Sequence, residues 1–269
     1  MTTSFVVSLK DGAEIAGMDE GRAQGEVDAI FLISGLGGTA SFWNPCVPIL
    51  SAHHRVLRID QRGIAASTRG ESTCTIEQLA RDCLDVMNSR GIESAIVIGH
   101  STGGCIAQEM ALLAPHRVKR LVLSGTWGQK NRYMQELFAL RRNMLTSDPR
   151  AYASTSSFLT YEPSWLTAHW STYEASLNNA PLTTMGQRIV QERIDALLNF
   201  DRSADLHKIK QPVLILGARD DVLVPAFLQE SLGKLISQAD IHIFSHGAHF
   251  FPVTRTEAFF QTLINWIES

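Results

Sequence analysis

The chain contains a serine whose sequence context could make its hydroxyl a nucleophile. Ser101 lies in the segment GHSTGG (residues 99–104), between the apolar run 95–98 and a helix-like run at 105–113. A serine hydroxyl becomes reactive when a sharp turn exposes it, a base accepts its proton and N–H donors stabilise the developing oxyanion. A G-x-S-x-G motif between a strand and a helix therefore indicates acyl-transfer chemistry.

Two adjacent aspartates are candidates for the acid that would orient the base. They lie in the segment GARDDVLVP (residues 217–225), directly after the apolar run 213–216. We assign the role to Asp221, which precedes Pro225 by four residues as in a D-x-x-x-P loop. Asp220, three residues after Gly217, is the alternative.

A histidine follows the aspartates in the order that such a site requires. The segment SHGAHF (residues 245–250) comes after the apolar run 241–244, and two small residues before His249 allow its backbone to approach the serine loop. His249 is predicted to accept the Ser101 proton and return it to the leaving group. A solvated loop histidine is one alternative. A metal site formed with His242 and His246 is disfavoured, because these residues span a strand and an irregular loop without a matching carboxylate motif.

The oxyanion donors are expected from two backbone segments. One is the peptide after Ser101, and the other is the loop SGLGGT (residues 34–39), which follows the apolar run 28–34. We predict the N–H groups of Leu36 and Thr102 as the pair. Each such donor can contribute about 3 kcal/mol to transition-state stabilisation.

The same glycine-rich loop also matches a dinucleotide-binding fingerprint. It reads G-x-G-x-x-A from residue 35, and Asp60 ends another strand about twenty residues later. However, the next helix would contain Pro45 and Pro48 in its interior, and a nucleotide site leaves Ser101 unexplained. We therefore disfavour a dinucleotide cofactor at this loop.

The elements that would position these residues alternate between strand and helix patterns. This alternation predicts an α/β fold with a mostly parallel central sheet flanked by helices. A hairpin formed by residues 5–9 and 13–18 and a polar connection at 19–26 precede the main strands. Those strands are predicted at 28–34, 55–59, 95–98, 120–123, 213–216 and 241–244, and helices at 75–89, 102–113, 226–235 and 256–267.

The alternation breaks where a long segment carries helical patterns and many aromatic residues. It predicts a helical cap at 127–200 inserted into a core domain made of 1–126 and 201–269. Five apolar residues fall near one helical face of the cap: Met134, Leu137, Phe138, Leu140 and Met144. We expect them to pack on the main domain. The alternative is substrate contact, since a hydrophobic lid would exclude water and favour an apolar or amphipathic acyl group.

Composition narrows the partners and the compartment. The net charge of −3 gives no electrostatic footprint for nucleic acid, so a small neutral or weakly polar ligand is expected. The four cysteines form no C-x-x-C pair and indicate neither a zinc site nor a disulfide framework. No signal sequence and no membrane-spanning apolar run are recognised, which predicts a cytoplasmic protein without membrane attachment.

Together, these motifs resemble the α/β-hydrolase superfamily over nearly the whole chain. Within it, the sequence is similar to small hydrolases grouped with 3-oxoadipate enol-lactonases and the aminoacrylate hydrolases of pyrimidine breakdown. Two positions depart from the pattern. Ser34 stands where a histidine is usual before the oxyanion glycine, and Ala65 replaces a glycine in the D-x-R-G-x-G-x-S loop that runs from Asp60 to Ser67.

The resemblance implies an α/β-hydrolase fold and hydrolysis through an acyl-enzyme formed on Ser101, which needs neither a metal nor an organic cofactor. The same machinery cleaves esters, lactones and amides, and N-acyl-homoserine lactones are one substrate class that it could accept. Two alternatives keep the fold and change the function. One is non-hydrolytic chemistry, such as cofactor-free oxygenation or a lyase reaction, and the other is a ligand-binding receptor that retains the three residues.

Overall fold

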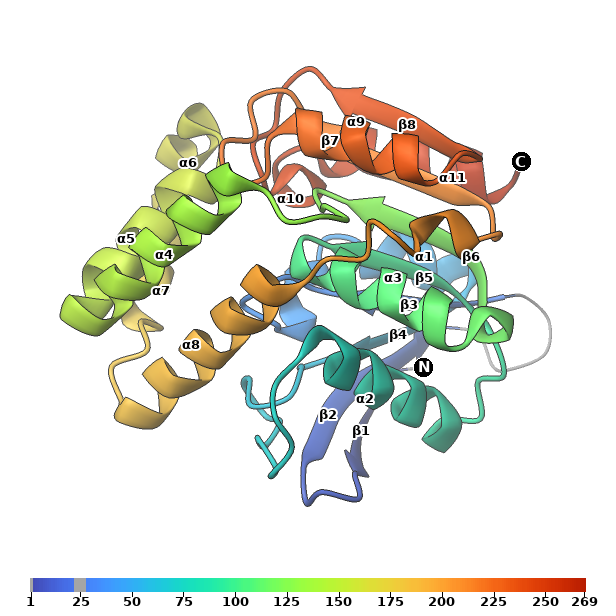
Figure 1. Cartoon of the computed structure of the whole chain (residues 1–269), viewed down its shortest axis with the longest axis horizontal. Coiled ribbons are helices and arrows are strands. Elements are labelled where there is room, and N and C mark those ends of the chain that lie inside the picture. Colours follow the sequence, from blue (N-terminus) through green and yellow to red (C-terminus); the bar gives the residue numbers. More distant parts are fainter. Residues whose placement is uncertain (1, 22–27) are drawn as a thin grey trace.

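The computed structural model describes residues 2–21 and 28–269, which form one eight-stranded sheet covered by helices (Figure 1). The strands are ordered β1-β2-β4-β3-β5-β6-β7-β8. The β1–β2 and β2–β4 pairs are antiparallel, and the other neighbouring pairs are parallel. The strands are β1 (Thr2–Ser8), β2 (Glu14–Gly21), β3 (Ala29–Ile33), β4 (Arg55–Ile59), β5 (Ala95–His100), β6 (Val118–Ser124), β7 (Val213–Ala218) and β8 (Ala239–Phe244).

Helices cover both faces of the sheet because its central strands are apolar on both sides. Every residue of β5 and β7 is buried. Alternate residues of β3 belong to two separate clusters, with Phe31 and Ile33 on one face and Ile30 and Leu32 on the other. The first face packs against α2 (Ile76–Ser89), α3 (Thr102–Leu113) and α9 (Ala226–Leu235), and the second against α1 (Val47–His53) and α11 (Thr256–Ile267).

The predicted α/β architecture is confirmed, with differences at the ends of elements. The helices predicted at 102–113, 226–235 and 256–267 coincide with α3, α9 and α11. The prediction that the helix after the glycine-rich loop contains Pro45 and Pro48 in its interior is wrong. Helix α1 begins only at Val47, so Pro45 precedes it and Pro48 lies in its first turn, where no intrahelical N–H is needed. The connection predicted at 19–26 begins inside β2, and its residues 22–26 lie outside the described residues.

Five helices lie between β6 and β7 and stand beside the sheet at the left of Figure 1. They are α4 (Arg132–Ser147), α5 (Pro149–Thr160), α6 (Pro163–Ala168), α7 (Trp170–Asn178) and α8 (Thr184–Asn199). The insert begins where β6 ends, so it extends from the carboxyl edge of the parallel strands. These helices occupy most of the predicted cap at 127–200, and the division into two domains stays a prediction.

The packing face of α4 differs from the predicted one at Leu140. Met134, Phe138 and Leu145 are buried, whereas 59% of Leu140 is exposed. Successive helical residues are separated by about 100°, so Leu140 lies two positions, or roughly 200°, from Phe138. The expectation that Leu140 packs on the main domain is therefore wrong, and Leu145 lies on that face instead.

In residues 2–21 and 28–269, none of the helices is long and apolar enough to cross a membrane.

One departure noted in the sequence has a structural consequence at Ala65. This alanine follows β4 in a turn with a φ of 49°, in the left-handed region that favours glycine. Such a conformation costs an L residue about 1–2 kcal/mol because the Cβ atom approaches the following carbonyl oxygen. The loop therefore keeps the turn that a glycine would form, at a cost in stability.

We predict that Ala65→Gly raises the free energy of unfolding by about 0.5–1 kcal/mol, since relief of the strained φ exceeds the added entropy of the unfolded chain. Urea denaturation followed by circular dichroism measures this change. Ala66→Gly is the matched control, because Ala66 is also exposed and does not have a positive φ. It should lower stability, and a loss of stability in both variants would contradict the argument.

Candidate active site

The turn between β5 and α3 places Ser101 in a strained backbone conformation. Its φ is 56° and its ψ is −123°, which L residues rarely adopt. The Ser101 N–H donates to the Ser124 carbonyl at 2.8 Å, and the Ser101 carbonyl accepts from the Gly104 N–H at 2.8 Å. The end of β6 and the first turn of α3 therefore hold this residue from both sides.

The two glycines of the G-x-S-x-G motif permit the close approach of three elements. A Cβ atom on Gly99 would lie 2.2 Å from the Gly103 carbonyl oxygen, and one on Gly103 would lie 2.2 Å from the Ile33 carbonyl oxygen. Real side chains cannot tolerate these separations. The motif thus fixes the packing of α3 against β5 and β3, which sets the direction of the turn at Ser101.

A buried carboxylate and imidazole form the second part of the site. Asp221 Oδ2 lies 2.8 Å from His249 Nδ1, and both residues are buried. The other oxygen, Asp221 Oδ1, accepts the N–H groups of Leu223 and Val224 at 2.9 and 2.8 Å. A carboxylate can only accept, so the proton of the imidazole must lie on Nδ1. Nε2 is then left as the basic nitrogen.

The neighbouring aspartate contacts the backbone of the histidine loop instead of the imidazole. Asp220 accepts the N–H groups of Gly247 and Ala248 at 3.1 and 2.9 Å. Ala248 has a φ of 53°, so this carboxylate stabilises a strained turn directly before His249. The two aspartates therefore have different contacts: Asp221 orients the His249 ring, and Asp220 holds the backbone of the loop before it.

The serine and histidine loops meet at the carboxyl end of β6. A Cβ atom on Gly125 would lie 3.4 Å from His249 Cε1, and the preceding residue, Ser124, accepts the Ser101 N–H. Among the described residues, Ser101 Oγ makes no hydrogen bond with His249. Such bonds are often long in a free enzyme and shorten when the substrate binds.

The loop after β3 lies directly against the serine. A Cβ atom on Gly35 would be 3.0 Å from Ser101 Cβ and 3.5 Å from Ser101 Oγ. In residues 2–21 and 28–269, the backbone N–H groups of Leu36 and Thr102 donate to no protein acceptor. The two amides predicted as oxyanion donors thus retain their hydrogen-bonding capacity.

Sequence reasoning did not identify His100 as part of this site. Its ring is fully buried, accepts or donates at Nδ1 with Ser124 Oγ at 3.0 Å, and stacks on Phe42 at 4.9 Å. Burial holds the pKa of His100 well below its usual range, and the nearby His249 lowers that pKa further. The two ring centroids are 4.8 Å apart. A neutral His100 can pack against His249 without charge repulsion.

The residues considered for a nucleotide or metal site, Asp60, His242 and His246, make other contacts in the structure. Asp60 Oδ1 accepts the Ala40 N–H at 2.8 Å, so this carboxylate shapes the loop after β3. His246 Nδ1 lies 3.2 Å from Glu162, and the His242 ring contacts Phe244. Within the described part of the chain, no group of three or more His, Cys, Asp or Glu residues is arranged to hold a metal ion.

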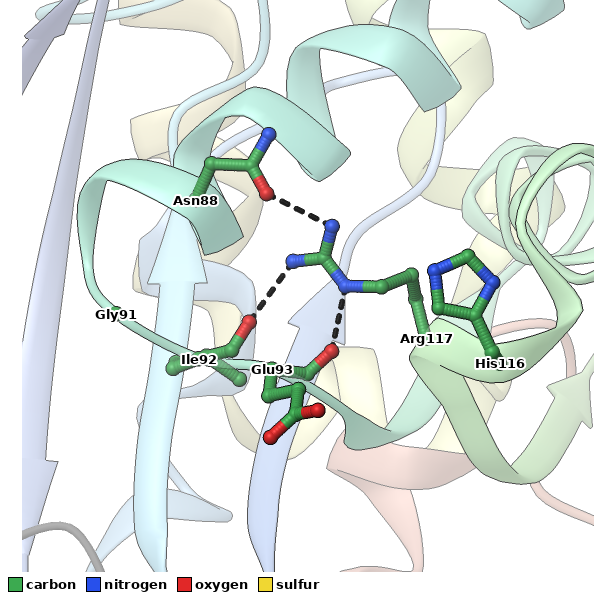
Figure 2. A pocket seen from close by; sticks show the side chains of 6 residues that line it. All are labelled: Asn88, Gly91, Ile92, Glu93, His116 and Arg117. Atoms are coloured by element: carbon green, nitrogen blue, oxygen red, sulfur yellow. Dashed lines mark hydrogen bonds between the residues drawn. The ribbon is translucent and has the colours of Figure 1, made fainter.

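A surface hollow lies at the other end of the strands from Ser101, near the amino ends of β5 and β6. Figure 2 shows the Arg117 guanidinium directed at Asn88 and at the carbonyls of Ile92 and Glu93. Each of the three guanidinium nitrogens thus already donates to an oxygen of the protein. The hollow has no contact with Ser101, which lies at the carboxyl end of β5.

Comparison with known proteins gives concordant matches. Residues 28–256 match the family described as alpha/beta hydrolase fold. A protein from Azorhizobium caulinodans named "Putative carbamate hydrolase RutD" is 33% identical over 238 residues, covering 88% of this chain and 90% of that protein.

Two solved structures share the fold. The enol-lactonase from Burkholderia xenovorans LB400 superposes with a TM-score of 0.89 at 23% identity, covering 98% of this chain and 100% of that chain. Est816, described as an N-acyl homoserine lactone degrading enzyme, superposes with a TM-score of 0.83 at 17% identity, covering 96% and 98%.

The two aspartates provide a test of the site geometry. We predict that Asp221→Asn lowers kcat about 10³- to 10⁴-fold, because an amide in this place favours the wrong tautomer of His249. Asp220→Asn, the matched control, should lower kcat less than about tenfold, since its remaining carbonyl can still accept one backbone N–H. Steady-state hydrolysis of a p-nitrophenyl ester measures both. A larger loss in the Asp220 variant would contradict the assignment.

Proposed function

Because the chain belongs to the α/β-hydrolase fold family, we propose that it is a serine hydrolase of small molecules, with Ser101, His249 and Asp221 as its catalytic residues. The observation that carries the proposal is the buried Asp221–His249 pair beside a serine held at a positive φ. This arrangement has the three parts of an acyl-transfer site, in the chain order found in this fold.

The first half of the proposed reaction forms an acyl-enzyme. Ser101 Oγ attacks the substrate carbonyl carbon while His249 Nε2 accepts the hydroxyl proton. The carbonyl oxygen becomes an oxyanion, which accepts hydrogen bonds from the N–H groups of Leu36 and Thr102. When the tetrahedral intermediate collapses, the bond to the leaving group breaks, and the proton on His249 passes to that group.

The second half returns the enzyme to its starting state. Water attacks the acyl carbon as His249 Nε2 takes one of its protons, and a second tetrahedral intermediate forms against the same two N–H groups. Collapse breaks the bond to Ser101 Oγ, which regains the proton from His249. The products are an alcohol or amine and an acid: a carboxylic acid from an ester, lactone or amide, and carbonic acid or its monoester from a carbamate cleaved at its C–N bond. No cofactor is required.

The substrate class follows from the leaving groups that this mechanism accepts. We include esters, lactones, amides and carbamates, since each presents a carbonyl carbon bonded to a protonatable oxygen or nitrogen. The carbamate in the name of the relative at 33% identity supports a C–N bond, and the two lactone-related structural neighbours agree with a cyclic ester. N-acyl-homoserine lactones contain an amide and a lactone and remain among the candidates.

Aromatic residues of the insert support an apolar acyl group. Phe250, the residue after His249, donates its backbone N–H to the Thr160 carbonyl of α5 at 2.8 Å and contacts Tyr161 at 5.0 Å between ring centroids. The rings of Tyr161 and Trp165 are stacked. An apolar surface that reaches the base excludes water and favours hydrophobic over charged groups.

We also infer a cytoplasmic location, which the four buried free cysteines support.

The nucleophile is tested by Ser101→Ala. This variant should lose labelling by a fluorophosphonate probe and reduce p-nitrophenyl ester hydrolysis by at least about 10³-fold, because it removes the attacking oxygen. Ser237→Ala, an exposed serine in a turn, is the control and should retain both. Labelling of the Ser101 variant at the wild-type rate would disprove the assignment.

Substrate class is tested by incubating the wild-type protein with esters, lactones, N-acyl amides and carbamates of short and long acyl chains, with products identified by mass spectrometry. We expect products in which water has been added across one acyl bond. Probe labelling without any hydrolysis would instead support a non-hydrolytic reaction or a receptor.

A further inference from the structure

A buried arginine of the insert contacts the loop that carries one proposed oxyanion donor. Arg193, in α8, is 1% exposed. Its Nε donates to the Leu36 carbonyl at 2.9 Å and its Nη2 to the Gly35 carbonyl at 3.3 Å. The Nη2 group also donates to Gln61 Oε1, and Gln61 Nε2 donates to the Ser34 carbonyl at 2.5 Å. Three successive carbonyls of this loop are thus held by one connected network.

The charge of Arg193 is directed at carbonyl groups rather than at an acid. The buried Arg58 pairs with Glu20, and the buried Arg62 pairs with Asp82 and Asp11. In the described residues, Arg193 forms no salt bridge, and burial lowers its pKa. An arginine stays protonated at neutral pH even so, because its ordinary pKa is far above neutral. Burying such a cation is costly, and here the backbone dipoles of the loop offset that cost.

The geometry of the peptide bond connects this network to the oxyanion donor. The Gly35 carbonyl and the Leu36 N–H belong to one planar trans peptide, in which they point in opposite directions. A hydrogen bond from Arg193 on the carbonyl side therefore fixes the direction of the N–H on the other side. That peptide adjoins the serine, since a Cβ atom on Gly35 would be 3.5 Å from Ser101 Oγ.

We propose that Arg193 is a positioning residue for the oxyanion hole, which it aligns and polarises through the Gly35–Leu36 peptide. The proposal rests on the proposed function. A cation at the carbonyl withdraws electron density from the peptide and strengthens its N–H as a donor, as in other charge-assisted and cooperative hydrogen bonds. The usual histidine of this loop is replaced by Ser34, whose buried Oγ has no partner among the described residues. The loop is consequently held by Arg193 and Gln61.

The network also connects the insert to the chemistry. Arg193 comes from α8, whereas Gly35 and Gln61 come from loops that follow β3 and β4. When α8 is in place, Arg193 reaches the oxyanion loop. A substrate that keeps α8 in place would therefore also keep the Leu36 N–H aligned.

Arg193→Met tests the proposal, because methionine keeps much of the apolar stem and removes the donors. We expect kcat for a p-nitrophenyl ester to fall about 100-fold with KM changed less than threefold, as for the loss of one oxyanion donor. The inhibition constant of a trifluoromethyl ketone, which forms an oxyanion adduct with serine, should rise by a similar factor. Arg193→Lys should fall between wild type and Arg193→Met, since an ammonium group can reach one carbonyl but lacks the planar fork.

The matched control is Arg141→Met. Arg141 is also a buried arginine of the insert, but its Nη2 donates to Ser156 and Tyr152 within the insert. This variant can lose stability, yet its kcat should stay within threefold of wild type at a temperature where circular dichroism shows it folded. A merely structural role for Arg193 would give both variants the same kinetics.

The outcomes are distinguishable. If the wild-type protein is active and Arg193→Met keeps its kcat and its affinity for the ketone, the positioning role is disproved while the proposed function stands. If Arg193→Met does not fold, Arg193→Lys decides in the same assays. If the wild-type protein neither reacts with the fluorophosphonate nor hydrolyses any ester, lactone, amide or carbamate, the proposed function fails, and the positioning role fails with it.

Discussion

The backbone at Ser101, with its φ of 56°, holds the candidate site together because it sets the direction in which the side chain leaves the turn between β5 and α3. A sparsely populated backbone geometry costs about 1–3 kcal/mol and persists where its surroundings over-determine it. One constraint is the bond from the Ser101 N–H to the end of β6, and another is the close contact of Gly103 with the Ile33 carbonyl. The parallel neighbours β3, β5 and β6 therefore position Ser101, the proposed nucleophile.

The two buried charged side chains on either side of the serine loop, Asp221 and Arg193, are both stabilised by hydrogen bonds to backbone groups. Asp221 is buried against His249 and accepts two backbone N–H groups from the residues that follow it. Arg193 is buried with opposite charge and donates to two carbonyls of the loop after β3. In both cases backbone dipoles replace much of the solvation that burial removes. Because those dipoles belong to short loops, the charges also fix the loops to which the proposed chemistry is assigned.

The sequence was most informative where function depends on local spacing. The serine motif, the two aspartates and His249 each follow a short apolar run, so the strands and the loops after them could be predicted, and the structure joins Asp221 to His249. Arg193 could not be found in this way, because its partners are more than 130 residues away in the chain and its own helix gives no signal. Leu140 was misplaced because apolar character alone does not define the phase of a helix.

The insert contacts the two loops that flank the serine, the histidine loop and the loop after β3, which has a consequence for the proposed selectivity. On one side, α5 accepts the backbone N–H of Phe250, next to His249, and on the other side α8 supplies Arg193 to the oxyanion loop. Selectivity in such enzymes depends on how tightly the transition state is held, not merely on how well the substrate fits. A change in the insert that reshapes the proposed acyl-binding surface can therefore move His249 or the Leu36 N–H as well. For this protein, substrate preference and turnover rate are expected to change together, because the insert proposed to select the acyl group also contacts the loops that carry His249 and Leu36.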